Sequence, residues 1–175
     1  IAHSSADAEA VAVGLVRGAF EFQGQKCSAA SRAYVPQSLW PTVKAKMLAD
    51  LASLKMGTTE DFRNFINAVI DEKAFDKITS YIADAKKAKG VEVIAGGNFD
   101  KTEGFFIEPT VLEVSDPQYV TMCEEIFGPV LTIYVYPDKQ FSETLDILDQ
   151  TSPYALTGAV FARDRAALDL ANSKL

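Results

Sequence analysis

The chain has 175 residues, of which 48% are hydrophobic and 23% are charged. This composition is typical of a globular domain with its own hydrophobic core, and it excludes a disordered chain. The formal net charge of -7 argues against a nucleic acid as partner, because such binding depends on clustered Lys and Arg. No run approaches the about 20 apolar residues that span a bilayer, so we expect no membrane partner either.

The first half of the chain predicts helices and one short strand. Apolar residues recur at helical intervals from Asp7, behind a Ser- and Asp-rich start that suits a helix N-cap. This helix leads into the segment FQGQKCSAASR at 22–32. We then expect a strand over 32–36 and helices over about 41–54 and about 71–88, the last closed by Gly90.

The second half alternates strands and helices. Residues rich in β-formers occur at 91–97 and 104–115, and the continuous apolar run at 131–136 is typical of a strand buried on both faces. An amphipathic helix over 138–150, a second buried strand over 156–162 and a helix over 163–172 follow. The alternation predicts an α/β fold with a mainly parallel sheet and helices on both faces.

Cys27 is the first candidate for chemistry. A free Cys is commonly a small buried side chain, and that interpretation stays open here. The preceding Gly24 and the strand that follows predict instead a tight turn, where the thiol and its backbone N–H face a cleft. Lys26 would favour the thiolate, which is the nucleophilic form.

Cys123 and His3 are weaker candidates for a catalytic role. Cys27 and Cys123 are far apart in the sequence, and we expect both to be free thiols in a reducing compartment. His3 is the only histidine, and a structural or capping role suits its place at the end of a short strand better than a role as base. With one His and no CxxC pair, we expect no metal site.

The second candidate is EEIFGPV at 124–130. Its simplest interpretation is a loop with two solvated carboxylates and a core Phe. The alternative is that a carboxylate of Glu124 or Glu125 holds ribose hydroxyls, as acidic residues do in dinucleotide sites, beside a flat apolar surface from Phe127. The glycines in IAGG, at 94–97, lack the GxGxxG spacing and predict only a turn.

The order and spacing of GQKCSAASR, at 24–32, and EEIFGPV resemble the catalytic domain of the aldehyde dehydrogenase superfamily. The resemblance covers essentially the whole chain. Stretches such as FEFQGQKCSAASRAYVPQSLWP and GFFIEPTVLEVSDP are most similar to the branch that oxidises glutamate-γ-semialdehyde, the open form of Δ1-pyrroline-5-carboxylate. It implies that residues 1–175 are a single cysteine-bearing catalytic domain, a piece of a longer enzyme whose NAD-binding domain lies outside this sequence.

The resemblance also implies a role for each site residue. Cys27 would attack the aldehyde carbon to give a thiohemiacetal, hydride would pass to NAD⁺, and water would hydrolyse the resulting thioester. Glu125 matches the glutamate that holds the nicotinamide ribose, and Phe127 matches the ring that packs near the nicotinamide. Ser28 matches a serine that helps bind the substrate's α-carboxylate. The general-base glutamate and the asparagine that completes the oxyanion site belong to motifs that this sequence lacks.

The partners follow from the same resemblance. It implies glutamate-γ-semialdehyde as the substrate, in proline catabolism, and NAD as the cofactor of the full-length enzyme, with no binding of NAD and no activity expected of this piece alone. The parent is expected to be a homo-oligomer in a bacterial cytoplasm or a mitochondrial matrix. Two alternatives stay open: an aldehyde dehydrogenase of another substrate class, and a non-catalytic interaction domain in the isolated chain.

Overall fold

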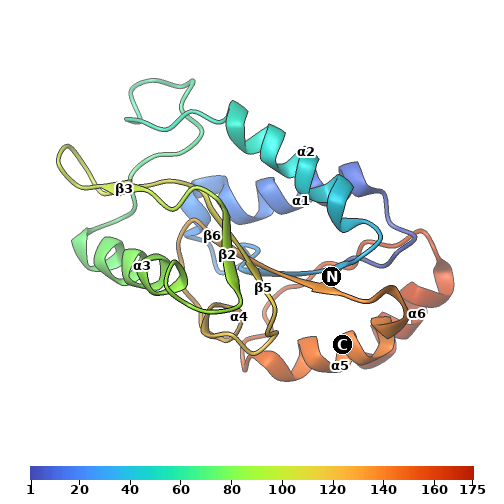
Figure 1. Ribbon diagram of the computed structural model, residues 1–175. Helices are drawn as coiled ribbons and strands as arrows, with labels where there is room; N and C mark the ends of the chain where they lie inside the picture. Colours follow the sequence, from blue (N-terminus) through green and yellow to red (C-terminus); the bar gives the residue numbers. More distant parts are fainter.

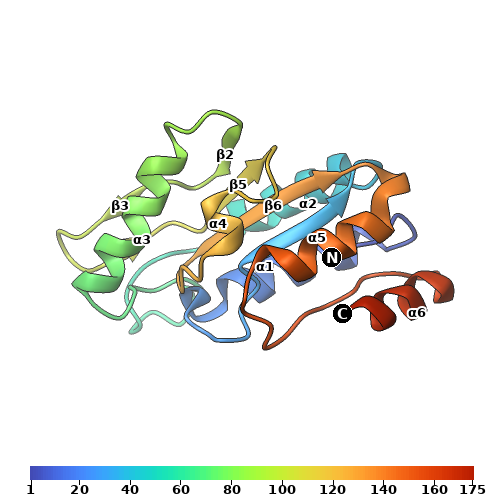
Figure 2. The same cartoon turned by 90° about the horizontal axis from the view of Figure 1, so that it is seen from below.

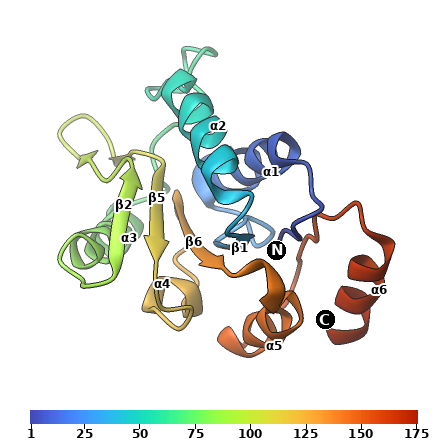
Figure 3. The same cartoon turned by 45° about the vertical axis from the view of Figure 1, so that its right-hand side comes forward.

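The structure, a computed structural model, describes all residues 1–175 and is built on a four-stranded sheet (Figure 1). Its strands are β1 (Arg32–Pro36), β2 (Val91–Ala95), β5 (Thr110–Val114) and β6 (Val130–Tyr136). Figure 3 shows them side by side in the order β2, β5, β6, β1. Strand β6 pairs in parallel with β1 and β5, whereas β2 is antiparallel to β5. The predicted mainly parallel sheet is therefore confirmed.

Apart from one short helix at 120–123, which the sequence did not predict, the helices begin and end within a few residues of their predicted bounds. They are α1 (Ala8–Phe20), α2 (Trp40–Ser53), α3 (Glu72–Ala85), α4 (Val120–Cys123), α5 (Phe141–Thr151) and α6 (Arg165–Lys174), with 3₁₀ turns η1 (Glu21–Gly24) and η2 (Asp138–Gln140). The Asp7 carboxylate caps α1 by accepting from the backbone N–H groups of Glu9 and Ala10. A small hairpin of β3 (Phe99–Asp100) and β4 (Phe106–Ile107) packs beside α3. None of the helices combines the length and apolar composition of a membrane span.

The sheet separates two layers of helices. Successive side chains of a strand point to opposite faces, so Ala33 and Val35 pack with α1 and α2 while Tyr34 packs with α5 and α6. In the same way Val111 packs on the face covered by α1 and α2, and Leu112 packs against α3 on the other face. Figure 1 shows α1 and α2 above the sheet with α5 and α6 below it, and Figure 2 shows α5 in front of the sheet with α2 behind. Helices cover both faces, as predicted.

The buried strand predicted over 156–162 is wrong. This segment makes only an isolated bridge between Ala2 and Phe161, in which the Phe161 N–H donates to the carbonyl of Ile1 at 2.9 Å. The Leu156 side chain is 69% exposed. The apolar pattern signals a preference for burial, but no strand of residues 1–175 pairs along this segment to bury it.

Candidate active site

The two motif segments line one cavity at the edge of the sheet where β1 and β6 begin. Because β1 and β6 are parallel neighbours, with Arg32 opposite Thr132, the loops that enter them lie side by side. The cavity between these loops and the C-terminal segment has a volume of about 820 Å³. It is lined by all four candidate residues from the sequence, which are Cys27, Ser28, Glu125 and Phe127.

Two glycines let the loops touch. Gly24 has a φ of +65°, in the left-handed region that favours glycine, and a Cβ there would collide with the carbonyl oxygen of Gly128. A Cβ on Gly128 would collide in turn with the side chain of Ile78 on α3. The close backbone contact between Gly24 and Gly128 therefore sets how near the cysteine segment lies to the 124–129 loop.

The cysteine segment begins with strained backbone, and hydrogen bonds to the loop before α3 hold it in place. Phe22 and Gln23 have φ values of 53° and 57°, although neither is a glycine. Such residues cost about 1 to 3 kcal/mol each and persist where the surroundings over-determine them. The buried Gln23 amide donates to the carbonyl of Ala68 at 3.3 Å, and the Ile70 N–H donates to Gln25 Oε1 at 2.9 Å. The loop before α3 thus fixes the path of the chain into the cysteine turn.

Cys27 and Ser28 face the cavity without internal partners. Both are exposed, and neither the thiol nor the backbone N–H of Cys27 makes a hydrogen bond within the chain. The Lys26 ammonium lies 3.1 Å from Glu21 Oε2, and hydrogen bonds from Lys26 and Arg17 lower the pKa of the Glu21 carboxyl. The Lys26 charge is therefore shared with a carboxylate at the end of α1 rather than directed at the thiol alone.

The 124–129 loop is held by its backbone and by the buried Ile126, and it leaves the side chains of Glu125 and Phe127 accessible. The Lys77 ammonium on α3 donates to the carbonyl oxygen of Glu125 at 2.9 Å. The Glu125 carboxylate is exposed and has no ion pair or hydrogen bond. Phe127 has a φ of 62° and is 43% exposed. A free carboxylate beside an accessible ring fits a ribose with its attached flat heterocycle, because the carboxylate can accept from both hydroxyls.

Two parts of the site could not be predicted from the sequence. Segment 152–161, which overlaps the buried strand predicted over 156–162, forms a wall of the cavity. Arg32 donates to the carbonyls of Met122 at 3.1 Å and Leu148 at 3.4 Å, and so ties the start of β1 to the end of α4 and to α5. The only signal in the sequence for Arg32 was a charged residue at the head of a predicted strand.

His3 lies outside the cavity, whereas Cys123 lies on its wall. The His3 ring packs edge-on against Phe141 at 4.7 Å and its Nδ1 lies 2.9 Å from Ser5 Oγ, so it has a structural place outside the cavity. Cys123 is partly buried at the cavity wall, with its Sγ 3.4 Å from the carbonyl of Gln118. The structure has no cluster of His, Cys, Asp and Glu that could hold a metal ion.

The model of the aldehyde dehydrogenase family matches residues 1–175, and the chain belongs to this family. The resemblance seen in the sequence is thereby confirmed.

Individual members of the family show which of its proteins this chain is similar to. The mitochondrial Δ1-pyrroline-5-carboxylate dehydrogenase of Dictyostelium discoideum is 53% identical over 173 residues, which are 99% of this chain and 31% of the relative. The crystal structure of the Mycobacterium tuberculosis enzyme of that name, bound with NAD, has a TM-score of 0.92 at 45% identity and covers 99% of this chain and 31% of that one. A betaine aldehyde dehydrogenase from Staphylococcus aureus, in complex with NAD⁺, reaches 0.88 at 30% identity, covering 99% and 35%. The chain thus spans about a third of the length of the relatives it matches.

Proposed function

We propose that residues 1–175 are the cysteine-bearing catalytic domain of a longer NAD-dependent dehydrogenase, which oxidises glutamate-γ-semialdehyde to glutamate. The observation that carries the proposal is the convergence of Cys27, Ser28, Glu125 and Phe127 on one cavity. Curated relatives at 44% to 53% identity are named Δ1-pyrroline-5-carboxylate dehydrogenase, and this supports the substrate. Those from eukaryotes such as Dictyostelium discoideum and Danio rerio are named mitochondrial, which supports a matrix location if the source is eukaryotic and leaves the cytoplasm if it is bacterial.

Cys27 supplies the nucleophile. Its thiolate forms a C–S bond to the aldehyde carbon, and the carbonyl π electrons move to the oxygen, giving a tetrahedral thiohemiacetal. When the oxyanion collapses, the hydrogen on that carbon leaves as hydride with its electron pair, and a thioester remains on the sulfur. Water then breaks the C–S bond, which releases the carboxylic acid and restores the thiol.

The backbone of the cysteine turn stabilises the oxygen during this sequence. The unpartnered Cys27 N–H is a donor available to the developing oxyanion, and such a donor needs no reorganisation during the reaction. On this proposal the second oxyanion donor and the base that activates water come from outside residues 1–175.

Glu125 and Phe127 would hold the cofactor. NAD⁺, when bound, accepts the hydride. The Glu125 carboxylate fits the ribose hydroxyls, and the accessible Phe127 ring fits the flat face of the nicotinamide. The Gly24 contact with Gly128 keeps this loop beside the cysteine turn, so hydride donor and acceptor are brought into one cavity.

Ser28 would contribute to specificity for a substrate that carries a carboxylate. Its exposed hydroxyl has no partner in the chain and is available to the substrate's α-carboxylate. Betaine aldehyde and other substrates without a carboxylate have no use for such a donor, so Ser28 bears on specificity more than on the chemical step.

The nucleophile is tested in the full-length enzyme with Cys27→Ser and the matched control Cys123→Ser, since both thiols lie at the same cavity. Cys27→Ser should reduce NADH formation from glutamate-γ-semialdehyde at least about 1,000-fold, as loss of a nucleophile typically does. Cys123→Ser should leave most activity in place. Comparable activity in Cys27→Ser and wild type would refute the proposal.

Substrate class is tested with Ser28→Ala in the same enzyme. Loss of one hydrogen bond to a charged group, about 0.5 to 3 kcal/mol, should raise the KM for glutamate-γ-semialdehyde roughly 2- to 160-fold. The KM for propionaldehyde should stay close to that of wild type. Equal losses on both aldehydes, or none on either, would leave the carboxylate-anchoring role without support and favour another substrate class.

A further inference from the structure

Ser5 joins the turn before α1 to the chain that enters α6. Its hydroxyl oxygen accepts from the backbone N–H of Arg163 at 3.0 Å and from that of Asp164 at 2.9 Å. Nδ1 of His3 lies 2.9 Å from the same oxygen. We refer to His3, Ser5 and the N–H groups of Arg163 and Asp164 as the His3 clasp. The clasp connects two segments that lie 158 residues apart in the chain.

The number of donors and lone pairs in the clasp fixes the protonation of His3. A serine oxygen has two lone pairs, and both accept N–H groups at the start of α6, so the Ser5 hydroxyl hydrogen remains to be donated. The acceptor within hydrogen-bond distance is Nδ1 of His3, which also accepts from the Ser5 N–H at 3.2 Å. A ring nitrogen that accepts carries no hydrogen. In the closed clasp the imidazole is therefore neutral, with its hydrogen on Nε2.

A proton on Nδ1 does not fit the closed clasp. It would bring a third donor to the Ser5 oxygen, and it would point toward the Ser5 N–H, which is itself a donor. To accept that proton, the Ser5 oxygen would have to release the N–H of Arg163 or of Asp164. Uptake of a proton by His3 is thus coupled to release of the chain that enters α6.

The charged side chains around the clasp are Asp7, Asp138, Arg163 and Asp164. Asp7 pairs with the Arg163 guanidinium at 2.6 Å, and Asp164 caps α6, so both carboxylates are already engaged. Hydrogen bonds from Ser38 lower the pKa of the Asp138 carboxyl, and the charge of His3 makes a smaller contribution. Asp138 therefore attracts a charged ring, whereas the hydrogen bonds of the clasp require a neutral one. Because histidine changes its charge between pH 5 and 8, the balance between these two states depends on pH.

The clasp continues the contact that holds the cavity wall at 152–161. The N-terminal residues lie along the chain that connects α5 to α6 (Figure 3). The Phe161 N–H donates to the Ile1 carbonyl at 2.9 Å, and the Phe161 carbonyl accepts from the His3 N–H at 2.8 Å. No backbone N–H of residues 155–160 makes a hydrogen bond within the chain. The wall is therefore held mainly at this end, two residues before the clasp.

We propose that the His3 clasp is a pH-sensitive device that fixes the end of the cavity wall. It is closed while His3 is neutral, and it opens when the ring takes up a proton. His3 is in this sense a positioning residue, since it acts through Ser5 and lies outside the cavity. The clasp itself rests on the hydrogen bonds of the chain, whereas its effect on turnover rests on the proposed function.

The proposal is tested by hydrogen exchange in the full-length enzyme at pH 5.5 and pH 8, with rates divided by the intrinsic rates at each pH. In wild type, exchange in residues 161–168 should be about tenfold faster at pH 5.5, because opening breaks backbone hydrogen bonds. His3→Asn keeps an acceptor near the position of Nδ1 but does not titrate, so its exchange should be the same at both pH values. Ser5→Ala removes the shared oxygen and should exchange fast at both.

Ser173→Ala is the matched control, because this hydroxyl on α6 bonds only to the Leu170 carbonyl. It should show the same pH response as wild type. Equal exchange of wild type at the two pH values would overturn the proposal, as would an unchanged pH response in His3→Asn. The readout requires no turnover. If Cys27→Ser retained activity, the proposed function would fail while hydrogen exchange still decided the role of the clasp.

Activity gives a second measure of the effect on the cavity. The kcat/KM of His3→Asn is divided by that of wild type at each pH, which cancels the pH dependence of the substrate and of groups that both proteins share. This ratio should be up to about tenfold higher at pH 5.5 than at pH 8, as expected if about a tenth of wild-type molecules keep the clasp closed at the lower pH. The same ratio at both pH values would show that the clasp does not position the wall.

Discussion

The cysteine segment at 22–31 and the loop at 124–129 hold their functional groups in different ways. The cysteine segment is anchored by side chains, since Gln23 and Gln25 bind the backbone of the loop before α3. The polar anchor of the 124–129 loop is on its backbone, since the Glu125 carbonyl accepts from Lys77, and the Ile126 side chain packs into the core beside it. In both, the groups that carry the proposed chemistry, the Cys27 thiol and the Glu125 carboxylate, have no partner within the chain.

The difference shows where each loop is vulnerable. The cysteine segment depends on buried, directional contacts and on left-handed backbone at three successive residues, 22 to 24. The 124–129 loop has one such residue, Phe127, and its anchor is a flexible lysine on an exposed helix face. Substitutions that disturb the first loop should therefore cost more stability than substitutions that disturb the second.

The largest effect is expected from Gly24→Ala, which disturbs both loops. The new Cβ would collide with the Gly128 carbonyl, and the alanine would have to adopt a left-handed φ. Strain and overpacking together should lower the free energy of unfolding by about 2 to 6 kcal/mol, measured by chemical denaturation. Gly158→Ala is the matched control, because nothing lies within 4 Å of its added Cβ. Equal stability of the two variants would contradict the close contact.

Gln23→Ala should be the next most damaging. It leaves the Ala68 carbonyl without its buried donor, which corresponds to a loss of about 1 to 3 kcal/mol. Gln25→Ala should cost less, because Gln25 is only partly buried and the Ile70 N–H is exposed enough to bond to water. Chemical denaturation of the two variants gives the comparison, and a larger loss for Gln25→Ala would reverse the assignment of the main anchor.

Lys77→Met should have a smaller and more local effect. Loss of the bond to the Glu125 carbonyl removes about 0.5 to 1.5 kcal/mol at most, and hydrogen exchange should quicken in residues 124–129 more than elsewhere. Lys73, one turn earlier on α3, makes no ion pair or hydrogen bond, so Lys73→Met is the control. If exchange in the loop is the same in both variants, Lys77 does not anchor it.

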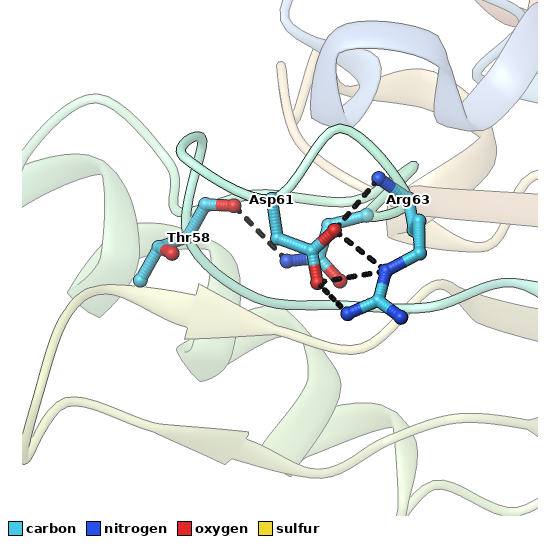
Figure 4. Close-up of polar contacts among 4 residues, drawn as sticks. Thr58, Asp61 and Arg63 are labelled. Carbon is cyan, nitrogen blue, oxygen red and sulfur yellow. Dashed lines mark hydrogen bonds and ion pairs between the residues drawn. The ribbon is translucent and has the colours of Figure 1, made fainter.

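The smallest effect concerns Asp61 and Arg63, in the loop between α2 and α3 (Figure 4). Hydrogen bonds from the Arg63 side chain, and then from its backbone N–H, lower the pKa of the Asp61 carboxyl. Since the folded pKa lies below the unfolded value of about 3.9, the pair stabilises the loop at pH above that value. Its contribution is lost as the pH falls through the folded pKa. An NMR titration should show the Asp61 pKa rising in Arg63→Gln, and an unchanged value would show that the pair does not order the loop.

Much of the local structure was predictable because it depends on short stretches of chain. The Asp7 cap, the apolar periods of α1, α3 and α5, and the apolar run of β6 each determine an element without reference to the rest. Segment 156–162 shows the limit. Its apolar pattern is that of a strand, but a strand exists only where another strand pairs with it.

The sequence by itself determined most of the helices and strands, the family and the four residues that we assign to the site, because motif spacing and apolar periodicity are properties of the linear chain. Only the tertiary structure decided that Cys27 and Glu125, about a hundred residues apart, share a cavity. That depends on β1 and β6 being parallel neighbours and on Gly24 touching Gly128. Lys77 as the anchor of Glu125 also arises from a contact between elements, which a linear pattern does not specify.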